Sequence, residues 1–195
     1  MSISVQELID PLTKPGTLKE DLGDGVVRCT ACAHRCIIKP GRRGICQVRF
    51  NKDGELRVPW GYVAALQIDP IEKKPFAHFY PSSDALSFGM LGCDFHCDYC
   101  QNWLTSQTLR DKRADIGAQY IREVSAEQLV QMALDNNAPI LVSTYNEPLI
   151  TTEWAVEMFK RGKKAGLKCA YVSNGYGTPE ALNMLQPYLD AYKID

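Results

Sequence analysis

Seven of the eight cysteines fall into two short segments of the chain. The second segment, 91-LGCDFHCDYCQNW-103, has the spacing Cys93-x3-Cys97-x2-Cys100. A four-iron cluster normally takes four cysteine thiolates, and this segment supplies only three. Three ligands would leave one iron open to a chelating molecule, just as catalytic zinc sites keep one position free for substrate. The incomplete set therefore predicts a catalytic iron–sulfur site.

The three cysteines by themselves leave a second interpretation open. A zinc knuckle, completed by His96 or by a distant ligand, would use the same thiols. Cys169 does not supply the missing ligand, because it lies in LKCAYVS, a predicted strand in which a buried structural thiol is expected.

The first segment contains four cysteines, with the spacing Cys29-x2-Cys32-x3-Cys36-x9-Cys46. Four ligands fit a closed tetrahedral site, and a small module needs such a metal to stay folded more often than a large one does. Zinc is the first expectation. An auxiliary iron–sulfur cluster and four reduced thiols without metal are the alternatives, because four thiolates satisfy either metal.

The composition excludes several classes of protein. A chain of 195 residues, 45% of them hydrophobic, can bury a core with a small module beside it. A net charge of -1 argues against nucleic-acid binding, and the pairs Arg42-Arg43 and Lys73-Lys74 are interpreted as solvated surface. The sequence has neither an apolar run of about 20 residues nor a signal peptide, so a cytoplasmic protein without a membrane partner is expected.

The elements that must position the cysteines are predicted from periodicity and turn residues. An N-terminal Cys-rich module spans residues 1–68, with a hairpin of strands 45–50 and 55–60 about a turn at 51–54. A proline-rich linker spans 69–84. Residues 85–195 then alternate four strands with three helices, the first helix opening on a capping box of Ser125 and Gln128. The predicted strands are 85–90, 139–144, 167–173 and 190–195.

This β(αβ)3 pattern predicts an α/β fold with helices over a parallel sheet. Ligands bind at the carboxyl ends of the strands in such sheets and barrels. We therefore expect the loops 91–103, 145–150 and 173–178 to share one mouth.

The segments 69-DPIEKKPFAHF-79, 91-LGCDFHCDYCQN-102 and 144-TYNEP-148, with the aromatic Tyr99 before the last cysteine, resemble a known family. They are similar to the radical S-adenosylmethionine (SAM) superfamily, and within it to the AmmeMemoRadiSam system enzymes, relatives of pyruvate formate-lyase activating enzyme. The resemblance runs from about Cys29 to Asp195. It implies a partial (β/α) radical SAM barrel.

The resemblance also implies cofactors and site residues. Cys93, Cys97 and Cys100 would hold a [4Fe-4S] cluster that chelates SAM and, once reduced, cleaves it to a 5′-deoxyadenosyl radical that abstracts hydrogen. The SAM region implied by the family motifs consists of Tyr99, Asn146, Glu147, Ser173, Asn174 and Asp195. The two glycines of the family's Gly-Gly-Glu motif are absent before Glu147, and Asp94 stands where relatives commonly have asparagine.

Two of these motifs also have a purely structural interpretation. Glu147 would then be a carboxylate at the start of a helix, favoured there by the helix dipole. Asn174-Gly175 would be no more than a turn.

The resemblance implies partners as well: a one-electron donor such as a flavodoxin or ferredoxin, and proteins of the AMMECR1-like and Memo-like kinds. Superfamily members usually have six βα units, whereas only four strands fit here. A truncated barrel, or one whose remaining half is supplied separately, is therefore expected. The alternative function is a non-catalytic iron–sulfur or zinc protein that transfers electrons or docks a partner.

Overall fold

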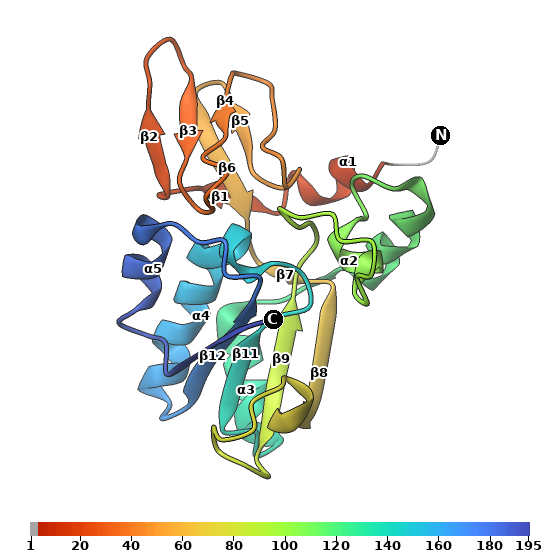
Figure 1. Ribbon diagram of the computed structural model, residues 1–195, viewed down its shortest axis with the longest axis vertical. Helices are drawn as coiled ribbons and strands as arrows, with labels where there is room; N and C mark the ends of the chain where they lie inside the picture. Colours follow the sequence, from red (N-terminus) through yellow and green to blue (C-terminus); the bar gives the residue numbers. More distant parts are fainter. Residues whose placement is uncertain (1–3) are drawn as a thin grey trace.

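A mixed five-stranded sheet forms the centre of the computed structural model, which describes residues 4–195 (Figure 1). Its strand order is β13-β12-β11-β9-β8, in which β9, β11, β12 and β13 run parallel and β8 pairs antiparallel with β9. The strands are β8 (Ala65–Pro70), β9 (Asp84–Gly89), β11 (Ile140–Ser143), β12 (Lys168–Ser173) and β13 (Ala191–Ile194). The four predicted parallel strands are confirmed, each to within about one residue of the expected ends.

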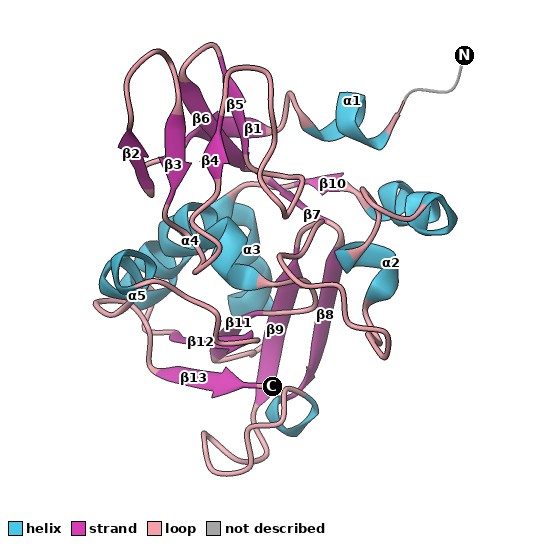
Figure 2. Ribbon diagram, turned by 45° about the horizontal axis from the view of Figure 1, so that its top comes forward, coloured by secondary structure: helices cyan, strands magenta, loops and turns pink. Residues whose placement is uncertain are grey.

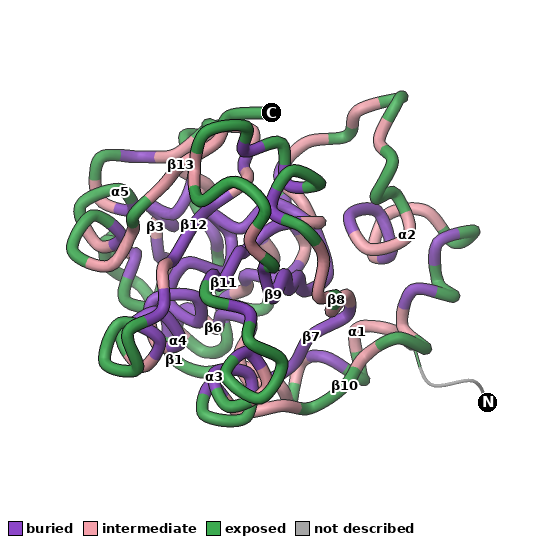
Figure 3. Tube along the Cα trace, turned by 90° about the horizontal axis from the view of Figure 1, so that it is seen from below, coloured by how far each residue is buried: buried purple, intermediate pink, exposed green. Residues whose placement is uncertain are grey.

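Successive residues of each strand face opposite sides of this sheet, as the strand period requires. Leu141 and Tyr171 pack into the larger core together with the helices, whereas Ile140, Val142 and Ala170 form a smaller cluster with Ile71 and Phe76. The helices are α3 (Ala126–Asp135), α4 (Thr152–Lys164) and α5 (Pro179–Leu185). Both faces of the middle strands are thereby buried (Figure 3).

The helix boundaries follow from local chemistry. Ser125 and Gln128 form the predicted capping box at the start of α3, with Ser125 Oγ accepting from the Gln128 amide at 3.2 Å. Thr178 caps α5, whose first residue is Pro179. Helix α4 ends before Gly166, which takes a φ of +82°.

Antiparallel sheets form the N-terminal module at the amino end of the chain (Figure 2). One sheet has the order β1-β6-β5 and another the order β2-β3-β4. The elements are α1 (Val5–Ile9), β1 (Thr13–Pro15), β2 (Lys19–Asp21), β3 (Val27–Cys29), β4 (Ile37–Ile38), β5 (Phe50–Lys52) and β6 (Glu55–Pro59). A short pair of β7 (Tyr62–Val63) and β10 (Arg122–Glu123) connects the module to the rest of the chain.

Two boundary predictions need correction. The first hairpin strand is β5 at Phe50–Lys52, not 45–50, and its two-residue turn is Asp53-Gly54, both with positive φ. The predicted domain boundary at 68/69 falls inside β8, so residues 69 and 70 belong to a strand of the central sheet and not to a linker. Pro70, the last residue of β8, carries a turn signal that dominates the sequence pattern here.

The remaining short elements lie around the cysteine loop and between strands: η1 (Ile71–Lys73), α2 (Trp103–Ser106), η2 (Lys112–Tyr120) and η3 (Pro148–Thr151). The larger hydrophobic core joins the N-terminal module to the central sheet, with Val48 and Leu56 packed in the same cluster as Phe88 and Trp154. Within residues 4–195, the helices are too short or too polar to cross a membrane.

Candidate functional site

A cavity of about 480 Å³ lies at the carboxyl ends of the parallel strands. The three loops expected to share one mouth all contribute to it, so this prediction is confirmed. Its lining includes the three cysteines of the second segment together with Ser106, Thr144, Tyr145, Asn146, Glu147, Ser173, Asn174, Asp195, Lys73 and Lys74.

Cys93, Cys97 and Cys100 are half-buried on the loop that follows β9. Cys93 Sγ accepts from the Phe95 amide at 3.4 Å, and Cys100 Sγ lies 3.3 Å from Ser106 Oγ. Burial raises the pKa of the Cys93 thiol to about 12, and the Asp94 charge acts in the same direction. A bound cation would offset both the burial and the Asp94 charge. The Cys93 sulfur is therefore expected to be a thiolate only when a metal is bound.

The three thiols fit an iron–sulfur cluster in donor chemistry, because all three line one cavity that has room on their open side. Across residues 4–195, no three Cys, His, Asp or Glu side chains converge closely enough to hold a single ion. A preformed zinc knuckle completed by His96 is therefore not seen.

Glu147 is the hydrogen-bonded centre of the cavity wall. Its carboxylate is 3% exposed and lies at the start of η3, where Oε1 accepts from the Leu149 amide at 2.9 Å and from Ser173 Oγ at 2.7 Å. Oε2 accepts from the Asn174 amide at 2.8 Å. Each carboxylate oxygen has two lone pairs, so Oε2 keeps an acceptor position beyond this bond. Glu147 thus caps a helix start and also reaches across to the loop after β12.

A second buried carboxylate lies close to Glu147. Asp94 is 2% exposed, its Oδ1 accepts from Asn174 Nδ2 at 2.9 Å, and its Oδ2 has no hydrogen-bond partner in the described part of the chain. Burial and then the Asp94 charge raise the pKa of Glu147 to about 7. Glu147 lines the cavity and Asp94 lies behind it, so two nearby carboxylates favour a positively charged group at this part of the wall.

Asn174 is more than a turn residue. Its side-chain carbonyl accepts from the Tyr176 amide at 2.9 Å, as in an Asx turn, while its Nδ2 donates to Asp94. Ser173 Oγ receives a hydrogen bond from Tyr192 Oη at 2.9 Å. The loop after β12 is therefore joined to the cysteine loop and to β13.

The other residues of the predicted SAM region have different surroundings. Asn146 is buried, and its Oδ1 accepts from the Met90 amide at 3.0 Å, which ties the end of β9 to this loop. Asp195 lines the cavity. Tyr99 does not line the cavity, and it is 87% exposed.

Sequence reasoning missed a cationic wall of the cavity. Lys74, expected to be solvated, is 6% exposed, and its Nζ donates to Tyr145 Oη at 2.9 Å and to Asp69 Oδ2 at 3.3 Å. Tyr145 has a φ of +72°, an uncommon conformation for a residue with a side chain. Lys73, the residue before Lys74, is exposed, as expected.

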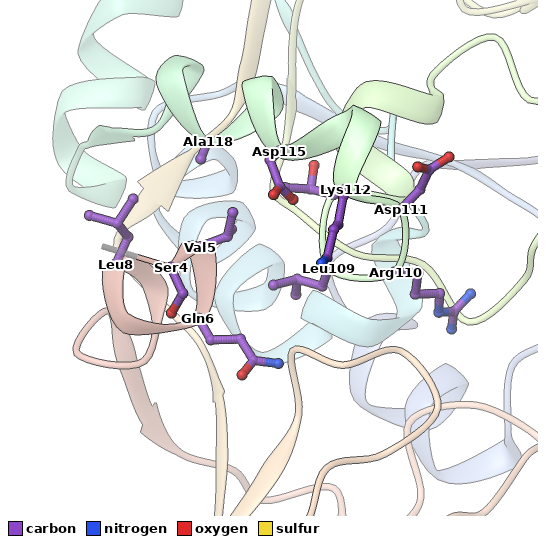
Figure 4. A pocket seen from close by; sticks show the side chains of 11 residues that line it. Ser4, Val5, Gln6, Leu8, Leu109, Arg110, Asp111, Lys112, Asp115 and Ala118 are labelled. Carbon is purple, nitrogen blue, oxygen red and sulfur yellow. The ribbon is translucent and has the colours of Figure 1, made fainter. Parts of the chain in front are cut away.

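A second cavity, of about 550 Å³, lies between α1 and η2 (Figure 4). Its walls carry Val5, Leu8 and Leu109 beside charged groups such as Lys112 and Asp115. Neither the cysteines nor the buried carboxylates line it. This second cavity is therefore not a site for the chemistry of those residues.

Comparison with known proteins agrees with this geometry. Residues 89–195 match the Radical SAM superfamily, and they include the three cysteines, Glu147 and the loop after β12. Because this match covers more than half of the chain, the protein belongs to the Radical SAM superfamily.

A curated relative is similar over most of the chain. It is the uncharacterized protein MJ0808 of Methanocaldococcus jannaschii, 40% identical over 177 residues, which are 90% of this chain and 51% of the relative. The chain thus spans about half the length of this relative.

Proposed function

We propose that this chain is the SAM-binding part of a radical SAM enzyme of the AmmeMemoRadiSam kind, similar to pyruvate formate-lyase activating enzyme. The observation that carries the proposal is the single cavity in which three cysteine thiols face the buried Glu147 carboxylate. A bound [4Fe-4S] cluster supplies the electron that cleaves SAM into methionine and a 5′-deoxyadenosyl radical for hydrogen abstraction.

The residues of the chain divide the work of binding. Cys93, Cys97 and Cys100 would be the cluster ligands. Glu147 would accept a hydrogen bond from the methionine ammonium at the free position of Oε2, and a positive partner would favour its ionised form. Ser173 and Asn174 hold the Glu147 carboxylate in place, so they act as positioning residues.

Charged side chains of both signs line the cavity. Glu147 and Asp195 are acidic, whereas Lys73 and Lys74, which pair with Asp69, are basic. Lining charges of both signs suit a zwitterionic ligand such as SAM, whose amino acid part carries both charges.

The finer assignments rest on the motif resemblance. They comprise the AmmeMemoRadiSam system itself, a flavodoxin or ferredoxin as electron donor, and AMMECR1-like and Memo-like partners. The cytoplasmic location is proposed from the sequence composition instead. The alternative function is a non-catalytic iron–sulfur or zinc protein, which would use the same thiols without a SAM site.

Anaerobic reconstitution with iron and sulfide, followed by dithionite and SAM, distinguishes the two functions. A radical SAM enzyme yields 5′-deoxyadenosine, and SAM changes the electron paramagnetic resonance spectrum of the reduced cluster. Glu147→Gln should weaken SAM binding at unchanged iron content, whereas Glu123→Gln, on the exposed strand β10, should not. If SAM leaves the spectrum of the reduced cluster unchanged and no 5′-deoxyadenosine forms, the non-catalytic protein is favoured.

A further inference from the structure

The four N-terminal cysteines, which the proposed function does not use, come together from separate segments. Cys29 ends β3, and its amide donates to the Cys36 carbonyl at 2.9 Å. The Ile45 amide donates to Cys36 Sγ at 3.4 Å, which brings the Cys46 loop against Cys36. Cys29, Cys32 and Cys46 are buried. Cys32 lies near both Cys29 and Cys46, so the four thiols share one region of the N-terminal module.

A buried cation lies beside these thiols. Arg49 is 1% exposed and lies close to Cys29, and its guanidinium donates to both carboxylate oxygens of Glu153, at 2.7 and 2.8 Å. Its Nε is buried without a hydrogen-bond partner among residues 4–195. Arg49 therefore keeps a free donor in this region, while Glu153 balances its charge.

This region contacts the loop that carries Cys93. A Cβ built on Gly92 would lie 2.9 Å from the Cys46 carbonyl oxygen, so the two backbones touch. Arg110 joins the same two loops: its Nη2 donates to the Cys93 carbonyl at 2.7 Å and also to the Ile45 carbonyl.

The Cys32–Cys36 loop makes a further set of contacts with the two loops that border the cavity. His34 Nε2 donates to the Asp94 carbonyl at 3.1 Å, which requires the tautomer with the proton on Nε2. The Ala33 amide donates to the Tyr176 carbonyl at 2.9 Å, and Cys32 forms a β-bridge with Gly177. Both sides of the cavity mouth are therefore held by residues next to N-terminal cysteines.

We propose that Cys29, Cys32, Cys36 and Cys46 form a second, four-thiolate metal centre, and that metal bound there holds the loops 91–97 and 174–178 in position. Zinc and an iron–sulfur cluster share this ligand chemistry. No three of these thiols among the described residues are close enough for a single ion, so binding needs a small inward shift of their loops or a centre larger than one ion. The role assigned to the loops rests on the proposed function, whereas the metal centre does not.

The decisive protein is the full chain with Cys93→Ala, Cys97→Ala and Cys100→Ala combined, because it lacks the catalytic ligands and keeps the N-terminal four. Purified anaerobically, it should contain either about one zinc or about four irons with four sulfides per chain. X-ray absorption should find four sulfur neighbours at about 2.3 Å around the metal. Finding either metal would support the centre. Finding no zinc and no iron would overturn it.

Two further comparisons complete the test. Adding Cys29→Ser and Cys46→Ser to that protein should remove the metal, whereas adding Cys169→Ser, a buried cysteine of β12, should not. Amide hydrogen exchange of residues 91–97 and 174–178 should become roughly tenfold faster when a chelator strips the metal. Equal exchange in the loaded and stripped proteins would overturn the positioning role. This readout needs neither SAM nor turnover, so its failure is distinct from failure of the proposed function.

Discussion

Arg49 and Glu153 form a bidentate ion pair inside the protein, with Nη1 2.7 Å from Oε2 and Nη2 2.8 Å from Oε1. Their side chains are 1% and 6% exposed. Arg49 belongs to the N-terminal module, and Glu153 to the first turn of α4. Glu153 Oε1 also accepts from the Leu18 amide at 3.2 Å. One buried pair therefore connects the cysteine module to the helix that begins beside the cavity.

Glu153→Gln should destabilise the protein by about 3–5 kcal/mol, because it leaves the Arg49 charge buried without its partner. Urea unfolding measures this loss. Glu157→Gln, on the same helix and paired with Arg161 near the surface, is the matched control and should cost less than about 1 kcal/mol. Equal effects of the two substitutions would contradict a special role for the buried pair.

The same pair predicts a loss of stability in acid. Burial acts to raise the pKa of Glu153, but the Arg49 charge and hydrogen bonds outweigh it, so the folded-state pKa lies below the ordinary value. A lowered carboxyl pKa contributes stability that is complete above the unfolded value of about 4.3 and is lost as the pH falls through the folded value. Unfolding free energies measured between neutral pH and pH 3 should therefore fall less steeply in Glu153→Gln. An unchanged slope would contradict this.

Gly92→Ala should disturb the cysteine loop. Gly92 has a φ of +88°, and an added Cβ would lie 2.7 Å from Val48 Cγ1 and 2.9 Å from the Cys46 carbonyl. Gly61→Ala controls for the backbone strain alone, because Gly61 has a similar φ of +71° and open space around its Cβ position. Thermal unfolding should show a cost of about 1–2 kcal/mol for Gly61→Ala and a clearly larger one for Gly92→Ala. Equal costs would mean that the loops of Gly92 and Cys46 can move apart without a loss of stability.

Arg110→Gln should loosen the loop that carries Cys93, Cys97 and Cys100, while the rest of the fold persists. The guanidinium donates to the carbonyls of Cys93, Phe95 and Ile45, and the shorter Gln side chain cannot reach all three. We expect a lower iron content after reconstitution, by severalfold, with the far-ultraviolet circular dichroism unchanged. Arg122→Gln, on the exposed strand β10, should retain full iron. Normal iron content in Arg110→Gln would show that the loop does not need this support.

Much of the fold could be predicted from local sequence. The four parallel strands, the capping box of Ser125 and Gln128, and the start of α5 at Pro179 were visible because period, caps and turns depend on residues close in the chain. Strand β8 and the first hairpin strand were misplaced, and the short strands β1, β2, β3, β4, β7 and β10 were not predicted. The pairing of β8 with β9 and of the first hairpin strand with β6 is long-range or follows the turn geometry, so propensity alone misplaced these two strands.

The site divides in the same way. The spacing of Cys93, Cys97 and Cys100 by itself indicated a three-thiolate site, because ligands on one loop are constrained by the chain that joins them. Tertiary structure decided that Glu147 reaches Ser173 and Asn174, that Lys74 is buried, and that Tyr99 points away. It also placed Cys46 behind Gly92, a contact between residues far apart in sequence. Such neighbours result from packing of the sheets and helices into one core, and no local pattern records which loops that packing brings together.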